Sequence, residues 1–188
     1  MQKQLIKYKS NVTRVPYKEG YAVVKIYTKK NHIWKLCENF DNIKDDVLLN
    51  RISNFYDKME EFHFGPKIYK KYINNNRLVL LMEYFPTQLT IEYIKLHYID
   101  INNFISNLYN SGYIHGDLPG NLMLNSNNEL KIIDFETMFE LNEKDNPLVC
   151  NWAIECAGSV NEYIKIEADC RKWFTDNRYK VSEIKIYR

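Results

Sequence analysis

The chain begins with short segments in which apolar and polar residues alternate, as is typical of β-strands. Residues 12–17 and 21–27 are rich in β-branched and aromatic residues, and residues 4–8 show a weaker pattern of the same kind. Lys18-Glu19-Gly20 separates the two stronger segments and predicts a turn between them. We therefore expect the first thirty residues to form β-structure.

A helix and a hairpin are predicted next. Apolar residues recur at three- and four-residue steps over residues 48–62, which places them on one helix face. Gly65-Pro66 is expected to end this helix, because proline cannot continue it and disfavours the helical conformation of the preceding residue. Residues 68–73 and 77–84 then predict a hairpin that turns at residues 74–76.

Helical patterns dominate the remainder of the chain. Residues 90–97 and 101–110 predict two helices, the second ending at Ser111-Gly112, where glycine suits a left-handed cap. Residues 122–124 and 130–133 predict a short hairpin, and a weaker helical pattern covers about residues 151–174. Strands followed by helices indicate the α+β class, with a natural hinge near Phe85-Pro86.

Charge and hydropathy exclude several classes of protein. The 188 residues include 26 Lys+Arg and 24 Asp+Glu, a formal net charge of +2, so nothing predicts a nucleic-acid partner. The longest apolar run, residues 78–82, is too short to span a bilayer. Residues 1–20 contain no continuous apolar segment of the kind found in signal peptides. We expect a cytoplasmic protein with no membrane span.

The cysteines give no sign of a metal site or a disulfide framework. They are scattered and form no C-x-x-C pair, whereas zinc sites need closer spacing and usually histidine partners. Free thiols in a reducing cytosol are the expected state. The four residues are Cys37, Cys150, Cys156 and Cys170.

Two polar segments carry the strongest chemical signal, Ile114-His-Gly-Asp-Leu-Pro-Gly-Asn121 and Lys131-Ile-Ile-Asp-Phe-Glu136. Asp117 lies in a turn rich in Gly and Pro, while Asn121 and Asp134 lie at the two ends of the predicted hairpin. Because a short hairpin brings its ends together, the Asn121 and Asp134 oxygens can converge on one Mg²⁺ ion. Asp117 can then accept a proton from an attacking hydroxyl. The alternative is a polar turn and hairpin with unrelated acids.

These segments resemble the catalytic and metal-binding loops of the protein-kinase-like superfamily. His-Gly-Asp and Asp-Phe-Glu are more similar to its atypical branches, which include the choline, aminoglycoside and lipopolysaccharide sugar kinases and the small kinase of the tRNA-modification complex. The resemblance implies a bilobal kinase-like fold in a single domain over residues 1–188. Residues 1–85 would form a small β-rich N-lobe, and residues 86–188 a truncated helical C-lobe.

A lone lysine in the second predicted strand supports this resemblance. Residues 21–27 are apolar on both faces except for Lys25, and a buried ammonium needs an anionic partner. Lys25 matches the family lysine that holds the α- and β-phosphates of ATP, and Val23 would lie over the adenine. The alternative is an edge-strand lysine whose ammonium reaches water.

The family pairs this lysine with a glutamate on a helix. No glutamate matches cleanly here, so Asp45 is the first candidate because it shares a helix face with Leu48 and Ile52. Asp46 and Glu38 follow. The equally open alternative is that Asp45 is a solvated acid at the positive end of the helix.

The resemblance also implies an adenine pocket. Met82 would take the gatekeeper position, the backbone of Glu83 and Phe85 would bind the adenine edge, and Met123 and Ile133 would form the floor. Each of these is also an ordinary core residue on sequence alone. His115 and Phe135 are expected to pack between the lobes and not to take part in the chemistry.

The pattern departs from the family in three places. No glycine precedes Gly20, so the segment expected to cover the phosphates, about residues 9–13, lacks the residues that let backbone amides approach phosphate closely. Asn121 follows Asp117 by four positions, where the family has five. Only 54 residues follow Asp134, with no Ala-Pro-Glu segment, and Gly116 replaces the arginine that pairs with an activation-loop phosphate.

The sequence therefore supports two functions. The first is an ATP- and Mg-dependent phosphotransferase acting on a hydroxyl of a small molecule or of a protein Ser/Thr. The second is a pseudokinase, a nucleotide-binding or protein-interaction module. A globular α+β domain with neither role is the remaining alternative.

Overall fold

A four-stranded antiparallel sheet forms the first part of the fold in a computed structural model that describes residues 11–29, 43–116, 118 and 120–143. Its strands are β1 (Asn11–Tyr17), β2 (Gly20–Tyr27), β3 (Ile68–Asn74) and β4 (Arg77–Glu83), in the order β1-β2-β4-β3. The predicted strands within residues 12–17, 21–27, 68–73 and 77–84 are confirmed to within a residue or two. The predictions for residues 4–8 and 151–174 lie outside the described residues.

Turn chemistry fixes the hairpin of β3 and β4. Asn75 and Asn76 both have positive φ, 48° and 56°, as a two-residue type I′ turn requires. Asparagine tolerates this conformation better than most residues, so the Asn-Asn pair sets the register in which Asn74 lies opposite Arg77.

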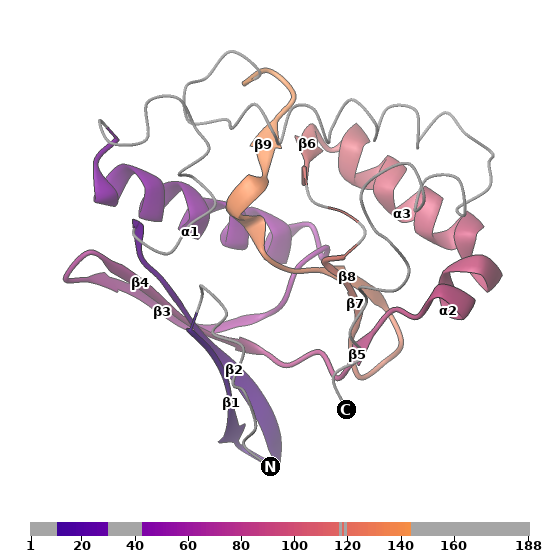
Figure 1. The fold of residues 1–188 in the computed structure, drawn as a ribbon, viewed down its shortest axis with the longest axis horizontal. Coiled ribbons are helices and arrows are strands. Elements are labelled where there is room, and N and C mark those ends of the chain that lie inside the picture. Colours follow the sequence, from indigo (N-terminus) through magenta and orange to yellow (C-terminus); the bar gives the residue numbers. More distant parts are fainter. Residues whose placement is uncertain (1–10, 30–42, 117, 119, 144–188) are drawn as a thin grey trace, which may run out of the picture.

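The long helix α1 (Asp45–Glu61) lies along one face of this sheet (Figure 1). Its predicted apolar face is buried from Leu48 to Met59, while Phe62 is exposed. The predicted end at Gly65-Pro66 was too late. The helix ends at Glu61, and His63 turns the chain with a φ of 60°.

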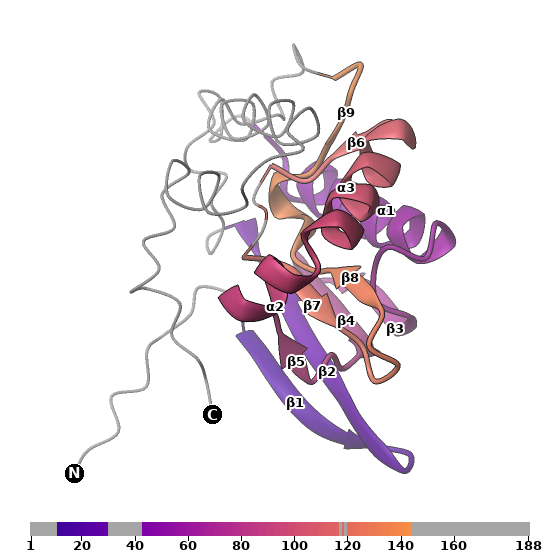
Figure 2. The same ribbon diagram turned by 90° about the vertical axis from the view of Figure 1, so that its right-hand side faces the viewer.

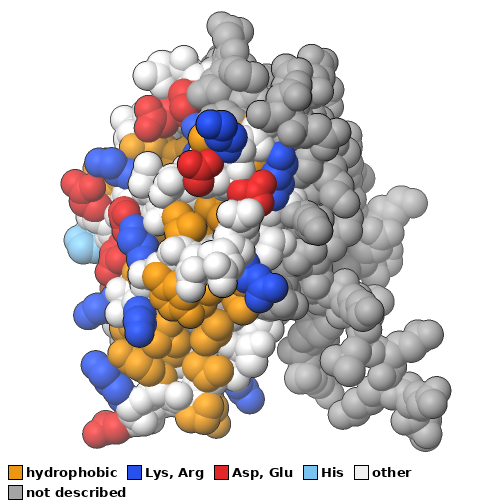
Figure 3. Space-filling model, turned by 90° about the vertical axis from the view of Figure 1, so that its left-hand side faces the viewer, with side chains coloured by type: hydrophobic (Ala, Val, Ile, Leu, Met, Phe, Trp, Pro, Cys, Tyr) orange, Lys and Arg blue, Asp and Glu red, His pale blue; other side chains and the backbone are white. Residues whose placement is uncertain are grey.

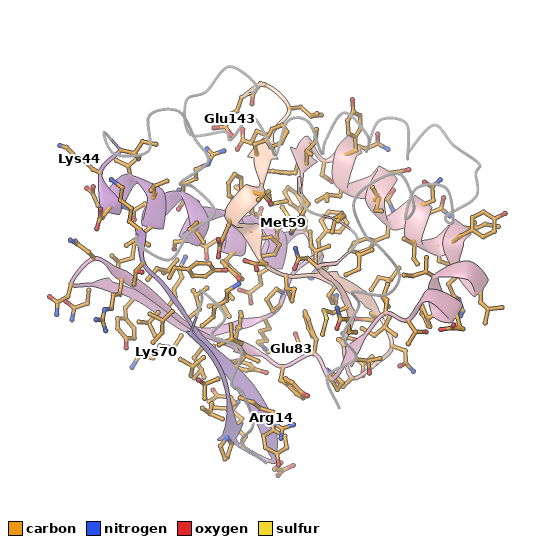
Figure 4. The ribbon with its side chains drawn as sticks, viewed as in Figure 1. Arg14, Lys44, Met59, Lys70, Glu83 and Glu143 are labelled. Carbon is orange, nitrogen blue, oxygen red and sulfur yellow. The ribbon has the colours of Figure 1, made fainter. Side chains whose placement is uncertain are left out.

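Gly65 is required because its backbone lies against the last turn of α1. Its amide donates to the Met59 carbonyl at 2.8 Å, and an added Cβ would lie 2.9 Å from Met59 Cβ and 3.1 Å from Phe135 Cζ. Figure 4 shows Met59 in the interior, where α1 comes beside the segment that follows β8. Gly65 therefore allows α1 and Phe135 to pack closely.

Replacing Gly65 with alanine is expected to destabilise the protein by about 1–3 kcal/mol, because the new methyl group overpacks this contact. The matched control is Gly20→Ala, since a Cβ at Gly20 meets nothing within 4 Å. Urea unfolding measures both variants. Equal effects at the two positions would contradict this account of Gly65.

The remaining elements follow in chain order after β4. They are β5 (Thr87–Gln88), α2 (Ile91–Leu96), α3 (Tyr98–Asn110), β6 (Tyr113–Ile114), β7 (Leu122–Leu124), β8 (Leu130–Ile132), the 3₁₀ turn η4 (Phe135–Thr137) and β9 (Phe139–Glu140). Both predicted helices and the second hairpin are confirmed. Thr90 caps α2 by accepting from the Tyr93 amide, and Gly112 follows α3 with a φ of 90°.

The elements that follow β4 include two small sheets. One has the order β5-β7-β8 and the other pairs β6 with β9. In Figure 1 the β5-β7-β8 sheet lies between the four-stranded sheet and the helices α2 and α3, and Figure 2 shows the same elements from the side. Buried residues from β2, α1, β4, α3, β7 and β8 form one continuous core cluster. The fold is therefore of the predicted α+β class, with a β-rich N-terminal part.

Hydrophobic side chains gather on the face shown in Figure 3, over its lower half, at the height of the four-stranded sheet in Figure 1. Among the described residues, large hydrophobic side chains on strands of this sheet are exposed at Val12, Tyr21, Tyr72 and Ile73.

Candidate functional site

An ion pair joins the two parts of the fold. Lys25 Nζ in β2 lies 2.7 Å from Oδ1 of Asp134, which follows β8. The lysine side chain is 5% exposed and the aspartate side chain 34% exposed, so the pair lies at the edge of the interior with one side open. Two residues 109 positions apart in the sequence therefore meet at one point, and both were singled out in the sequence as candidate site residues.

The sheet buries Lys25. Lys25 lies opposite Leu80 in β4 and Val12 in β1, because β2 is an inner strand of the sheet. The alternative of an edge-strand lysine that reaches water is therefore wrong. Side chains alternate along a strand, so Val23, Lys25 and Tyr27 share one face, and Tyr27 on that face contacts Tyr56 of α1.

The hairpin of β7 and β8 brings Asn121 beside Ile133, the residue before Asp134. The Ile133 amide donates to the Asn121 carbonyl at 3.0 Å, which closes the open end of the hairpin. Asp134 then adopts a left-handed conformation, with φ 67° and ψ 69°. This conformation is uncommon for a residue other than glycine, although aspartate is among those that adopt it most often. It redirects the chain just after the strand, where the carboxylate meets Lys25.

Charges around the ion pair favour its ionised form. Burial by itself would raise the pKa of Asp134, but the charge and hydrogen bond of Lys25, with smaller contributions from His115 and Glu136, hold that pKa below its ordinary value. Burial would lower the pKa of Lys25, yet Tyr56, Asp134 and Glu136 together raise it. Lys25 and Asp134 are therefore both charged over the whole physiological pH range.

The pH dependence of stability follows from these directions. The depressed pKa of Asp134 stabilises the fold above the ordinary value of 3.8, and this contribution is lost as the pH falls through the folded-state pKa. The raised pKa of Lys25 stabilises below 10.5, and this contribution is lost as the pH rises through the folded-state pKa. Urea unfolding measures the free energy of unfolding of the wild type and of the double variant Lys25→Met/Asp134→Asn. The difference between the two should become smaller below pH 3.8 and above pH 10.5. A difference that grows as the pH falls below 3.8 would contradict it.

Two buried tyrosines beside the ion pair were not recognised from the sequence. Tyr27 OH and Tyr56 OH lie 2.7 Å apart, and both side chains are fully buried. Burial raises the pKa of Tyr56 to about 12, so its phenol is neutral. Two features of the sequence could have indicated them. Tyr27 follows Lys25 by two residues and so shares its strand face, and Tyr56 lies on the apolar face of the predicted helix.

His115 and Phe135 hold the neighbouring backbone. His115 Nε2 lies 2.8 Å from the Ile133 carbonyl, and Thr137 Oγ1 donates to the His115 carbonyl at 2.7 Å. The Phe135 ring packs edge-on against Tyr56, with centroids 4.5 Å apart, and its centroid lies 5.9 Å from that of His115. This arrangement fits the packing role that the family resemblance implies for both residues.

The helix acids do not supply the partner of Lys25. Asp45 and Asp46 lie in the first turn of α1, where carboxylates interact favourably with the helix dipole, and Glu38 lies outside the described residues. The Lys25 ammonium instead pairs with Asp134. The prediction of Asp45 as partner is therefore corrected. Asp45 is the first residue of α1, whereas the residue of α1 whose hydroxyl contacts the strand of Lys25 is Tyr56.

The residues predicted for an adenine pocket lie on three segments. Val23 and Met82 are opposite each other in β2 and β4, and Phe85 is buried just beyond β4. Figure 4 shows Glu83 at the end of β4, where its amide donates to the Lys67 carbonyl at 2.9 Å and its carboxylate accepts from the Lys67 amide at 3.2 Å. Met123 and Ile133 are partly buried on the β7–β8 hairpin, Met123 opposite Gln88 and Lys131.

The predicted catalytic loop is described only in part. Gly116 has a φ of 78°, a conformation that favours glycine, which gives a local reason for Gly in place of the usual arginine. Asp117 lies outside the described residues, and so do residues 9 and 10 of the segment predicted to cover the phosphates, whereas residues 11–13 of that segment begin strand β1. The role of Asp117 as general base therefore stays a prediction.

The described part of the chain shows neither a cluster of metal ligands nor a membrane-spanning helix. Within the described ranges, no three His, Cys, Asp or Glu side chains are grouped as a metal site would require. A magnesium ion that takes phosphate and water oxygens does not need such a group. None of the helices in these ranges is long and apolar enough to cross a membrane.

Comparison with protein families gives one match. The model of a family described as ABC1 atypical kinase-like domain matches residues 49–165, more than half of the chain. The matched range contains Asn121 and Asp134, whereas Lys25 precedes it. No curated protein matches the chain. The match confirms the atypical kinase-like class, and the particular resemblance to the choline, aminoglycoside, lipopolysaccharide sugar and tRNA-modification kinases stays a prediction.

Proposed function

We propose, because the chain belongs to the ABC1 atypical kinase-like family, that it is a phosphotransferase that moves the γ-phosphate of ATP to a hydroxyl. The observation that supports this most strongly is the ion pair of Lys25 and Asp134. Removing both charges from water is costly, so a pair buried at the junction of two parts of a fold is more easily explained by a charged ligand than by stability.

The residues present fit Mg-ATP. Asp134 and Asn121 supply hard oxygen atoms at the end of one hairpin, and Mg²⁺ in such sites keeps several waters and binds through one or two protein ligands and the substrate phosphates. Lys25 supplies a compact positive charge for phosphate. When bound, Mg²⁺ would neutralise phosphate charge and orient the phosphate chain.

Each protein group then has one role. With Mg-ATP bound, Lys25 would exchange its contact with Asp134 for the α- and β-phosphates, and Asp134 and Asn121 would hold the metal. Asp117 orients the acceptor hydroxyl and takes its proton. An apolar slot would hold the adenine, formed by the side chains of Val23, Met82, Met123 and Ile133 and by the backbone of Glu83 and Phe85.

The proposed organisation has one domain over residues 1–188, with lobes at 1–85 and 86–188 and the nucleotide between them. The acceptor is a hydroxyl of a small molecule or of a protein Ser/Thr. The scattered positions of the cysteines in the sequence, with no C-x-x-C pair, support a reducing compartment such as the cytoplasm as the place of action.

A pseudokinase is the second candidate. Two features favour it: the absence of glycine before Gly20, and the spacing of four positions between Asp117 and Asn121. A shift of about 1 Å in catalytic groups can lower a rate on the order of a hundredfold. In that case the chain binds nucleotide or a protein without transferring phosphate.

Turnover of ATP tests the proposal. The full chain is incubated with Mg²⁺ and γ-labelled ATP, alone and with a set of small alcohols, sugars and a Ser/Thr-containing protein substrate. We expect label transfer or slow hydrolysis that Asp117→Asn reduces by about 10²–10⁴-fold. Nucleotide binding with no turnover in any of these mixtures would favour the pseudokinase.

A further inference from the structure

Helix α1 reaches the neighbourhood of Lys25 with a phenol, because Tyr56 of α1 contacts Tyr27, which lies two residues after Lys25 in β2. Among the described residues, the contacts of Lys25 do not include any carboxylate of α1. Two of the helix acids have partners of their own, since Asp57 pairs with Lys71 and Glu61 with Lys58. The residue of α1 whose hydroxyl contacts the strand of Lys25 is Tyr56, which lies 2.7 Å from the hydroxyl of Tyr27. The position that a family glutamate would occupy is therefore served by an uncharged hydroxyl group.

Tyr56 acts through Tyr27. The two hydroxyl oxygens are 2.7 Å apart, and the Tyr27 hydroxyl makes a long contact of 3.5 Å with Asp134 Oδ1, the oxygen that also accepts from Lys25. Lys25 Nζ lies 4.6 Å from the centroid of the Tyr27 ring, within the range of a cation–π contact. Tyr27 of β2 thus contacts both the ammonium and the carboxylate, and Tyr56 of α1 contacts the Tyr27 hydroxyl.

Packing fixes the position of Tyr56. Its side chain is fully buried, and its ring packs edge-on against Phe135, the residue after Asp134. One phenol therefore contacts the strand that carries Lys25 and the loop that carries Asp134, while its backbone belongs to α1. A shift of α1 would move the hydroxyl relative to both.

We infer that Tyr56, acting through the hydroxyl of Tyr27, is a positioning residue that holds Lys25 and Asp134 in register and takes the place of the missing helix acid. Its part in nucleotide binding rests on the proposed function, whereas the positioning of Lys25 does not.

A neutral positioning group has a chemical consequence. A helix carboxylate would cancel part of the Lys25 charge, whereas a phenol orients its neighbours by hydrogen bonding and leaves the charge intact. When Asp134 turns toward a metal, Lys25 then keeps its full charge for phosphate. This arrangement offsets part of the weaker phosphate grip expected from a covering segment without glycine.

The first test needs no nucleotide. The full chain is treated briefly with an amine-acetylating reagent, and modification of Lys25 is measured by mass spectrometry. In Tyr56→Phe, which keeps the ring and its packing on Phe135, we expect the Lys25 acetylation rate to rise about tenfold, as the loss of one hydrogen bond in the network allows. The matched control is Tyr113→Phe, a buried tyrosine in β6 whose ring contacts Phe55 and Phe62. Its Lys25 rate should equal that of the wild type.

The second test separates positioning from general damage. Tyr56→Phe should weaken binding of Mg-ATP about tenfold while adenosine, which has no phosphates, binds as it does to the wild type. Tyr27→Phe should behave alike, and the double variant should be no weaker than either single variant, because the two hydroxyls act as a unit.

The outcomes separate the two claims. A folded Tyr56→Phe or Tyr27→Phe with unchanged Lys25 acetylation would overturn the inference, and so would equal weakening of adenosine and Mg-ATP. If Tyr56→Phe does not fold, Tyr27→Phe decides alone. Faster acetylation in the variants of a chain whose wild type binds no Mg-ATP would support the positioning pair and remove the proposed function.

Discussion

Replacing Asp134 with asparagine is expected to abolish the stabilisation that Mg-ATP gives the wild-type chain. At a ligand concentration about 100 times the dissociation constant, binding stabilises the folded state by about 2.7 kcal/mol. For a chain of this size that corresponds to an increase in melting temperature of about 5–11 °C. Asparagine keeps the size of the side chain but removes the charge that attracts both the metal and Lys25. Scanning calorimetry with and without Mg-ATP measures the shift.

Lys25→Met should lose the same shift, since it removes the charge for phosphate while keeping an unbranched apolar side chain in the sheet. The control is Asp57→Asn, which removes one carboxylate from a surface pair with Lys71. It should keep the full shift. Retention of the shift in Asp134→Asn would mean that the nucleotide, if it binds, binds elsewhere.

Replacing Phe135 with alanine is expected to cost about 3–5 kcal/mol of unfolding free energy, the usual range for a buried phenylalanine. The Phe135 side chain is fully buried and contacts the rings of Tyr56 and His115, so its loss leaves a cavity where α1 meets the loop of Asp134. Urea unfolding of the chain without nucleotide gives the value.

Phe135→Leu is the matched variant, because leucine refills most of that space. It should cost clearly less than Phe135→Ala, about 1.5 kcal/mol if the site repacks well. A cost below about 1 kcal/mol for Phe135→Ala would show that this ring does not hold the two parts of the fold together.

The strands and helices of the described residues were predictable because local signals agreed with one another. The Asn-rich turn between β3 and β4, the Thr90 cap and Gly112 each specify a backbone conformation that the neighbouring periodicity also favours. The end of α1 was misplaced because Gly65-Pro66 is a strong signal, while the residue that stops the helix is His63 with a positive φ. Histidine carries no such signal in a sequence.

The candidate site was predictable in its charged members and not in its neutral ones. An ammonium in an apolar strand and an aspartate after a hairpin strand are unusual enough to stand out, and Lys25 and Asp134 do meet. The left-handed backbone of Asp134 could not be read from the sequence, because aspartate adopts this conformation only in a minority of cases. On sequence alone Tyr27 and Tyr56 look like ordinary core residues. The sequence does not show whether a tyrosine hydroxyl contacts another tyrosine 29 positions away or reaches water.

Calorimetric titration of the wild-type chain with Mg-ATP, repeated with ATP and a metal chelator, tests the central claim that Lys25, Asn121 and Asp134 form a site for metal-bound triphosphate. We expect Mg-ATP to bind at one site, with an affinity that falls at least about tenfold when the metal is removed. Absence of binding at millimolar Mg-ATP, or equal affinity with and without the metal, would contradict it.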